Sequence, residues 1–286
     1  MSDIKNFDLN DGTTFRYKKI GKGPPLILLH TIRNRLEYFY SVIPSLKNIY
    51  TIYAIDLPGF GDSPVNPKVN YDEVYMRNAI IEFIKNKNLS KVTLAGESIG
   101  GVLPITVAEK IPDKIKHIFS FNPYDYDKKF GDGIRRGSLI ARFIIWSMSL
   151  PFLGNFFAML ESKPILWLIF RGGVYRKSAI TNQYLSILTS SIGKPGNLYH
   201  LRNVLANYDS WTKSKVSYGK IKTPVTLVYG EYDWSKPTER NETMKLLGLK
   251  KFTTISECGH FSFLEAPEKV ANILSKPALI RILSKK

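Results

Sequence analysis

Residues 91–101, KVTLAGESIGG, constrain the fold of this chain more than any other segment. The stretch from Lys91 to Glu97 is apolar and rich in β-forming residues, and a segment with helical spacing follows directly after Ser98. The glycines on both sides of Ser98 permit the tight backbone of a strand-to-helix turn. Because such a turn presents its serine at the carboxyl edge of a sheet, we expect a parallel sheet with Ser98 at that edge.

The rest of the chain supports an α/β fold class. Short β-rich stretches alternate with helix-like segments as far as Asn122, which is the pattern of strand–helix units on a parallel sheet, and the alternation resumes at Pro224. Strands are predicted over residues 14–20, 25–30, 50–56, 91–97, 115–122, 224–229 and 251–256. Helices are predicted over residues 36–46, 71–86, 98–110, 237–247 and 267–274.

Residues 124–216 break this alternation and are typical of an inserted helical module, so we expect an α/β core of residues 1–123 and 217–286 around it. Within the insertion, the charge-free stretch 143–160 is long enough to span a membrane. Pro151, Gly154 and Asn155 lie in its middle, where they favour two short helices. We therefore predict a buried or interfacial helical pair and not a membrane span.

The chain is strongly basic, with 41 Lys and Arg against 24 Asp and Glu, a formal net charge of +17. The insertion carries 13 basic and 5 acidic residues and is about twice as basic per residue as the remainder. Basic residues interleaved with aromatic ones favour an anionic membrane surface or an amphiphilic anion over nucleic acid, for which no motif is present. The amino terminus lacks the pattern of a signal peptide, which predicts a cytoplasmic protein. The basic and aromatic insertion adds the hypothesis of a peripheral contact with a membrane.

Two later segments supply partners for Ser98. A serine hydroxyl needs a nearby base to become a nucleophile, and the base needs an acid to fix its tautomer. Asp233 follows the strand predicted at 224–229, and His260 follows the strand predicted at 251–256. The chain order of serine, acid and histidine is the order that such a sheet requires. Glu231 and Asp125 compete with Asp233 for the role of the acid.

Together these segments resemble the α/β-hydrolase superfamily. The resemblance lies in LLHT at 28–31, DLPGFGDS at 56–63, GESIGG at 96–101, YGEYDW at 229–234 and GHF at 259–261. It implies an α/β-hydrolase fold, with a mostly parallel eight-stranded sheet, flanking helices and a helical lid after the sixth strand, where residues 124–216 stand. It also implies a catalytic triad of Ser98, Asp233 and His260.

By position, the backbone N–H groups of Ile32 and Ile99 are predicted to form the oxyanion hole. Most members of the superfamily place a glycine where this chain has Thr31, whose hydroxyl we expect to contact the substrate. The His-Thr pair with Gly-Glu-Ser also resembles the hydroxynitrile lyase branch. That branch carries a lysine after its catalytic histidine, whereas this chain has Phe261.

We therefore expect a serine hydrolase that cleaves carboxylic esters or related acyl compounds through an acyl-enzyme, without a cofactor or metal. The many aromatic residues of the insertion predict an apolar or amphiphilic ester substrate, with Trp146 and Phe157 among the residues that bind it. Arg33 and Arg35 either face a distal anionic group of the substrate or are solvated charges at a helix start. Carbon–carbon bond cleavage, acyl transfer and a non-hydrolytic ligand receptor remain as alternatives.

Overall fold

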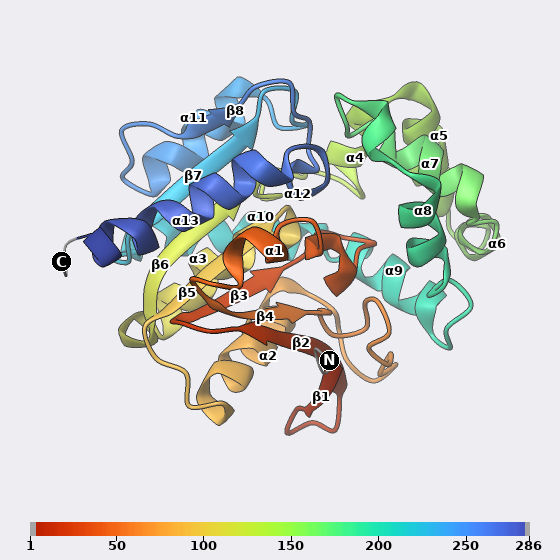
Figure 1. The fold of residues 1–286 in the computed structure, drawn as a ribbon. Helices are drawn as coiled ribbons and strands as arrows, with labels where there is room; N and C mark the ends of the chain where they lie inside the picture. Colours follow the sequence, from red (N-terminus) through yellow and green to blue (C-terminus); the bar gives the residue numbers. More distant parts are fainter. Residues whose placement is uncertain (1–3, 284–286) are drawn as a thin grey trace.

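The computed structural model describes residues 4–283, which form one eight-stranded sheet with helices on both faces (Figure 1). The strands lie in the order β1-β2-β4-β3-β5-β6-β7-β8; β1 and β2 are antiparallel to their neighbours and the others are parallel. This confirms the predicted eight-stranded, mostly parallel sheet. The strands are β1 (Ile4–Asp8), β2 (Thr14–Gly21), β3 (Pro25–Leu29), β4 (Thr51–Ile55), β5 (Val92–Glu97), β6 (Ile115–Phe121), β7 (Val225–Gly230) and β8 (Thr253–Ile255).

Helices cover the central strands on both faces, which is why β3 and β5 are continuous apolar stretches without alternation. On one face α1 packs against α13, and on the other α2 packs against α3 (Figure 1). The helices of the core are η1 (Leu36–Phe39), α1 (Ile43–Leu46), α2 (Glu73–Asn86), α3 (Ile99–Lys110), η2 (Pro112–Lys114), α11 (Pro237–Leu246), α12 (Ser262–Glu265) and α13 (Pro267–Leu283).

Two elements differ from the sequence-based prediction. The edge strand β1 was not predicted, because only Phe7 of its five residues is buried and no apolar alternation marks it. The helix predicted over residues 36–46 is divided into η1 and α1. Pro44 lacks the N–H that a helix continuing from η1 would need at this position, so α1 begins anew with Pro44 in its first turn.

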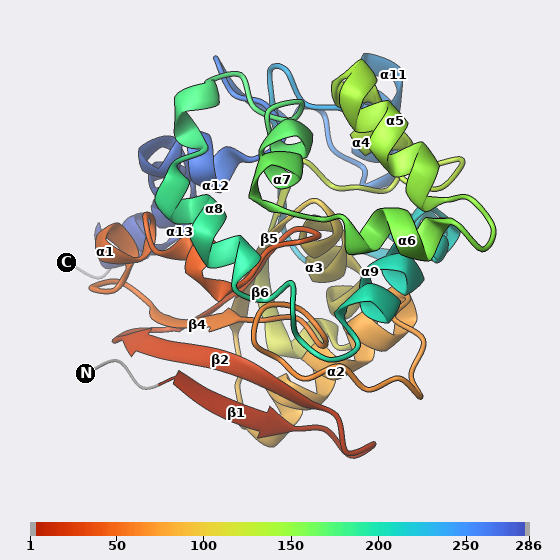
Figure 2. The ribbon, with the colours of Figure 1, turned by 90° about the vertical axis from the view of Figure 1, so that its right-hand side faces the viewer.

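All regular structure between β6 and β7 is helical, and the helices from α4 to α9 lie beyond the carboxyl ends of the parallel strands (Figures 1 and 2). The last two, α10 and η4, pack against α2 and α3 of the core. We call this segment the helical insertion; it comprises α4 (Asp132–Gly137), α5 (Leu139–Met148), α6 (Gly154–Met159), α7 (Lys163–Phe170), η3 (Lys177–Ala179), α8 (Asn182–Thr189), α9 (Asn197–Ala206), α10 (Tyr208–Lys213) and η4 (Ser214–Lys220).

The charge-free stretch 143–160 is divided as its turn residues predict. Helix α5 ends at Met148 and α6 begins at Gly154, with Pro151 and Phe152 in the turn between them and Phe152 at a φ of 60°. No helix within residues 4–283 is both long and apolar enough to cross a bilayer.

Candidate active site

Ser98 lies in the sharp turn between β5 and α3 that the sequence predicts. Its backbone is in a strained left-handed conformation, with φ 62° and ψ −123°, and its side chain is buried. The flanking glycines are required by close packing: a Cβ on Gly96 would overlap the carbonyl oxygen of Gly100, and one on Gly100 would overlap that of Leu29. The turn therefore holds the Ser98 hydroxyl at the carboxyl edge of the sheet.

The structure brings Ser98, His260 and Asp233 into one hydrogen-bonded chain. His260 Nε2 lies 2.9 Å from Ser98 Oγ, and His260 Nδ1 is hydrogen-bonded to Asp233 Oδ1. Asp233 Oδ2 accepts a hydrogen bond from the Ser235 N–H at 2.9 Å and another from the Ser235 hydroxyl. With Nδ1–H donating to the carboxylate, Nε2 is free to accept the proton of Ser98.

The electrostatics favour a charged Asp233. Burial opposes its ionisation, but the adjacent His260 and the hydrogen bonds from His260 and Ser235 outweigh burial and lower the pKa of Asp233. A buried carboxylate beside the imidazole stabilises the imidazolium that forms when His260 takes a proton.

The two competing acids lie elsewhere. Asp125 accepts a hydrogen bond from the Thr243 hydroxyl at 2.9 Å and pairs with Lys215 at 3.6 Å, while burial raises its pKa to about 6. Glu231 accepts a hydrogen bond from the N–H of Glu257 at 3.0 Å. Within residues 4–283 neither carboxylate is hydrogen-bonded to His260.

The ring and the backbone of His260 are each held by a group that the sequence did not single out. Trp234 stacks on it, with ring centroids 4.0 Å apart and an interplanar angle of 20°, and the Trp234 indole N–H donates to the Gly172 carbonyl at 2.9 Å. The backbone N–H of His260 donates to the Gly173 carbonyl at 2.6 Å. The helical insertion thus contributes backbone oxygens that fix the histidine loop.

A buried polar network supports the same loop from beneath. The Asn122 side chain donates to the His260 carbonyl at 3.0 Å and to Ser262 Oγ at 2.8 Å, and its Oδ1 accepts from the Gly230 N–H at 2.7 Å. Glu97 accepts from the Ser262 N–H at 2.7 Å and from the Tyr38 hydroxyl. Burial, opposed by these hydrogen bonds, raises the pKa of Glu97 to about 8.

The loop after β3 holds the first of the two predicted oxyanion donors. His30 is buried; it donates from Nδ1 to the Thr31 carbonyl at 2.7 Å and accepts the Leu57 N–H at Nε2 at 3.0 Å, so it fixes the backbone next to Ile32. Within the described part of the chain, the N–H groups of Ile32 and Ile99 donate to no backbone or side-chain acceptor. The Thr31 hydroxyl is also buried, with no hydrogen-bond partner among the residues described.

A cavity with mostly apolar walls is lined by Trp234 and Phe261, whose rings contact the ring of His260. Its volume is about 30 Å³, close to the space that one water molecule occupies in the liquid. The core side contributes Ile32, Trp234 and Phe261, which neighbour the predicted oxyanion and triad residues. The insertion contributes side chains from α4, α5, α7, α9 and the turn before α7, namely Ile134, Ile145, Met148, Glu161, Leu166, Ile169, Phe170, Leu201 and Leu205.

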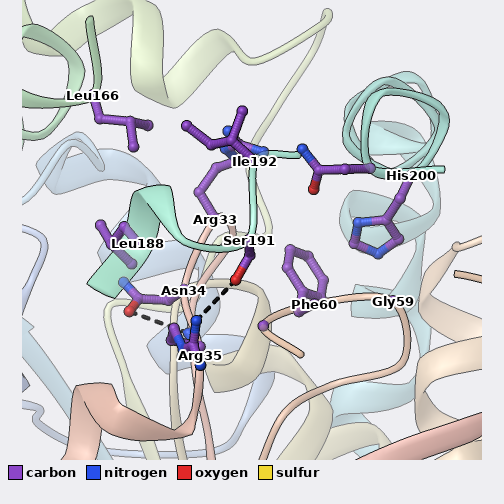
Figure 3. Close-up of a pocket in the computed structure, with 12 residues that line it drawn as sticks. Arg33, Asn34, Arg35, Gly59, Phe60, Leu166, Leu188, Ser191, Ile192 and His200 are labelled. Atoms are coloured by element: carbon purple, nitrogen blue, oxygen red, sulfur yellow. Dashed lines mark hydrogen bonds between the residues drawn. The ribbon is translucent and has the colours of Figure 1, made fainter. Parts of the chain in front are cut away.

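Arg33 and Arg35 have different ion-pair partners, and Arg33 lines two cavities, of which Arg35 lines one. Arg33 lines this apolar cavity and forms an ion pair with Glu161 of the insertion. Arg35 faces a second, more polar cavity of about 20 Å³ (Figure 3), where its guanidinium donates to Ser190, Ser191 and the Ile187 carbonyl. Arg35 also pairs with Glu37 and Asp62. Arg35 therefore ties the insertion to the core, and neither side chain is a solvated charge.

The two aromatic residues predicted to bind the substrate do not line the apolar cavity. Trp146 is on the outer face of α5, 45% exposed and beside Phe143, with ring centroids 5.9 Å apart. Phe157 is half-buried on α6 and packs against the hydrophobic core. The face of α5 that lines the cavity holds Ile145 and Met148 instead. Helical spacing identified an amphipathic helix, but it did not tell which aromatic residues point inward.

Comparison with known proteins identifies the class. The model of the α/β hydrolase fold family matches residues 24–267, and the chain belongs to that family. It is 23% identical over 270 residues to abhydrolase domain-containing protein abhd-5.2 of Caenorhabditis elegans, covering 87% of this chain and 58% of that protein. It is 25% identical over 285 residues to epoxide hydrolase 4 of mouse, covering 93% and 76% of the two chains.

Among solved structures, Cfl2 of Burkholderia cenocepacia superimposes with a TM-score of 0.79 at 19% identity, covering 96% of this chain and 94% of that one. The first three curated relatives are matched over only 58%, 44% and 39% of their own lengths. The family and the fold are thereby shown, and the choice of substrate rests on the site itself.

Proposed function

We propose that this protein is a serine hydrolase that cleaves carboxylic esters with apolar acyl groups. The observation that supports the proposal is the hydrogen-bonded chain from Ser98 through His260 to Asp233, located beside a cavity with mostly apolar walls. Activation of a serine by a histidine that is oriented by a buried carboxylate is the arrangement that acyl transfer requires.

In the first half-reaction, Ser98 Oγ attacks the ester carbonyl carbon while His260 Nε2 takes the hydroxyl proton. The N–H groups of Ile32 and Ile99 stabilise the negative oxygen of the tetrahedral intermediate. The intermediate collapses, the C–O bond to the alcohol breaks, and His260 returns the proton to the departing alkoxide. Asp233 stabilises the imidazolium throughout. The products of this step are an acyl-Ser98 ester and a free alcohol.

In the second half-reaction, water takes the place of the alcohol. His260 removes a proton from the water as its oxygen attacks the acyl carbon, and the tetrahedral intermediate forms in the same oxyanion site. Collapse breaks the bond to Ser98 Oγ, which regains its proton from His260. The acid is released and the enzyme is restored without any cofactor.

In this proposal the helical insertion acts as a lid. A cavity of about 30 Å³ holds roughly one water, whereas small-molecule sites commonly occupy about 300 Å³ or more. Helices α5, α7 and α9, which form its outer wall, therefore have to move outward before an acyl chain enters. The walls that close over the chain would be Ile145, Met148 and Leu205.

Labelling with a fluorophosphonate probe tests the nucleophile. The wild type should be labelled and the Ser98→Ala variant should not, while Ser41→Ala, an exposed serine on the core, should react like the wild type. Hydrolysis of a nitrophenyl ester should fall by at least about 10³-fold in Ser98→Ala. Undiminished labelling of Ser98→Ala would assign the nucleophile to another residue.

A series of nitrophenyl esters tests the acyl preference. We expect kcat/KM to rise from acetate to octanoate, because each added methylene buries more apolar surface in the cavity. A preference for acetate would contradict the apolar substrate. Absence of hydrolysis across an ester, thioester and lactone panel, combined with thermal stabilisation by a ligand, would favour a receptor instead.

Two rival chemistries lack their key residue. A hydroxynitrile lyase of the branch that this chain resembles carries a lysine at the position of Phe261, and here Phe261 is buried against Phe170 and Trp234. An alkyl-enzyme route, as in epoxide hydrolysis, uses an aspartate at the nucleophile turn, where this chain has Ser98. Both observations favour acyl chemistry.

A further inference from the structure

The outer surface of the helical insertion leaves an unusual number of large apolar side chains exposed. Of the seventeen exposed large hydrophobic residues among those described, nine lie between residues 139 and 160, on α5, α6 and the turn joining them. Phe152 is 97% exposed, Leu139 78% and Met159 70%. We call this surface the α5–α6 face; it consists of Leu139, Ile140, Phe143, Trp146, Phe152, Leu153, Phe156, Met159 and Leu160.

The face is the outer side of helices whose inner sides are already packed. On α5 the inner side chains Ile145 and Met148 line the cavity beside His260, and Ala141 is buried. On α6 Ala158 is buried in the core. In Figure 1 α6 lies at the right-hand edge of the molecule, away from the sheet, and in Figure 2 this side faces the viewer. The exposed residues are therefore not needed to hold these helices in place, and an apolar patch of this kind marks an interaction surface.

The charges around the face are almost all positive. Residues 133–208 contain a single acidic residue, Glu161, and it is paired with the largely buried Arg33. Arg142 is exposed on α5 itself, and Lys163 begins α7. Arg171 follows the last residue of α7, with its guanidinium over the Trp167 ring. Within residues 4–283 these three cations form no salt bridge. The nine basic residues of this range are Arg135, Arg136, Arg142, Lys163, Arg171, Arg176, Lys177, Lys194 and Arg202.

This charge selects among the possible occupants. A second copy of the chain would bring one positive face against another with no carboxylate free to compensate, which costs free energy. An anionic bilayer supplies both an apolar interior for the aromatic and aliphatic side chains and lipid phosphates for the cations. Trp146 and the phenylalanines suit the boundary between headgroups and acyl chains. Helices as short as α5 and α6 lie in that boundary and do not cross the bilayer.

We propose that the α5–α6 face docks on the surface of an anionic lipid bilayer. The apolar side chains of α5, α6 and their turn enter the headgroup region, and Arg142, Lys163 and Arg171 contact lipid phosphates. Because α5 separates this face from the cavity beside His260, docking places the cavity one helix away from the lipid. If the proposed function holds, this position would let an amphiphilic ester pass from the bilayer to Ser98 without crossing water.

Flotation with vesicles tests the docking. The full chain should float with vesicles of equimolar phosphatidylglycerol and phosphatidylcholine, bind vesicles of phosphatidylcholine alone at least about tenfold less, and dissociate as salt is raised. The double variant Phe152→Ser/Phe156→Ser should bind the anionic vesicles at least about tenfold less than the wild type. Val216→Ser removes a side chain that is 83% exposed outside the face, and it should bind like the wild type.

A second pair of variants tests how much positive charge contributes to vesicle binding. Arg142→Glu should weaken binding to the anionic vesicles several-fold, and Lys250→Glu, an exposed lysine of the core, should leave it unchanged. Equal binding to neutral and anionic vesicles, equal losses in the face and control variants, or a dimer that Phe152→Ser/Phe156→Ser dissociates would each overturn the proposal.

Two further measurements separate this proposal from the proposed function. Ser98→Ala should bind vesicles as tightly as the wild type. The face variants should hydrolyse a water-soluble ester at the wild-type rate, because their side chains lie outside the cavity. Vesicle binding without hydrolysis would leave the docking intact and reject the esterase, and hydrolysis without vesicle binding would do the reverse.

Discussion

The carboxyl edge of the sheet and the helical insertion differ in which side chains they bury. The sheet edge buries polar groups in hydrogen bonds, and the insertion leaves large apolar groups exposed. At the sheet edge Asn122, Glu97 and Asp233 are buried and each makes several hydrogen bonds. On the insertion, the outer side of α5 and α6 leaves residues such as Phe152 almost fully exposed. A network of satisfied buried polar groups has one low-energy arrangement, whereas an uncovered apolar face gains free energy from a partner.

This contrast suggests a division of labour. Reacting groups have to be held to within a fraction of an ångström, which suits the rigid network beneath His260. In the proposed function the helical insertion has to move, which suits helices as short as α5 and α6. If the contrast holds, substitutions of the buried polar groups at the sheet edge should cost more activity and stability than substitutions on the outer side of the insertion.

The largest effect should come from Asp233→Asn. An amide cannot stabilise the imidazolium and favours the wrong tautomer of His260, so kcat for ester hydrolysis should fall by about 10³–10⁴-fold with little change in the melting temperature. Steady-state kinetics and a thermal melt measure the two quantities. Retained activity would assign the role of the acid to Glu231 or Asp125. It would also mean that the buried Asp233 carboxylate is not needed for catalysis.

Asn122→Ala should have the next largest effect. It removes hydrogen bonds to the His260 carbonyl, Ser262 Oγ and the Gly230 N–H, and leaves buried groups without partners. We expect a loss of about 2–4 kcal/mol in the free energy of unfolding, together with a lower kcat. Asn155→Ala, on the exposed side of α6, is the matched change in the insertion and should stay within about 0.5 kcal/mol. Equal losses of unfolding free energy in Asn122→Ala and Asn155→Ala would contradict the contrast between the two regions.

Glu97→Gln should have the smallest effect, visible mainly as a pH dependence. Burial raises the pKa of Glu97 from 4.5 to about 8, so between these values the folded state binds a proton that the unfolded state has lost. This group therefore contributes its full stability below about pH 4.5 and loses it as the pH rises through about 8.

The variant cannot lose a proton, so its free energy of unfolding should fall less than that of the wild type between about pH 5.5 and 8.5, by about 1–3 kcal/mol. Urea titrations at the two pH values measure the difference. Glu268→Gln, an exposed glutamate of α13, should behave like the wild type. A pH dependence that Glu97→Gln leaves unchanged would mean that Glu97 is charged in the folded protein at neutral pH.

Much of the framework follows from local patterns. The glycines around Ser98 predicted its turn, because only glycine fits where Gly96 meets Gly100 and Gly100 meets Leu29. The positions of Asp233 and His260 after consecutive strands were also readable, since parallel strands end at one edge. The weakly patterned β1 was missed because its pairing with β2 across the sheet decides it, and the division between η1 and α1 was missed because apolar helical spacing runs through both.

The sequence by itself determined the alternation of strands and helices in the core from residue 14 onward, the turn at Ser98, the basic charge of the insertion and the division of residues 143–160 into two helices. Only the tertiary structure decided which side of α5 lines the cavity, that Trp146 points outward, that Arg33 meets Glu161, and that Asn122 and Trp234 hold the histidine loop. The physical reason is the separation along the chain of the residues whose interactions decide each feature. Turns and helix breaks depend on neighbours a few residues away, whereas the inward face of a helix depends on where distant segments place it.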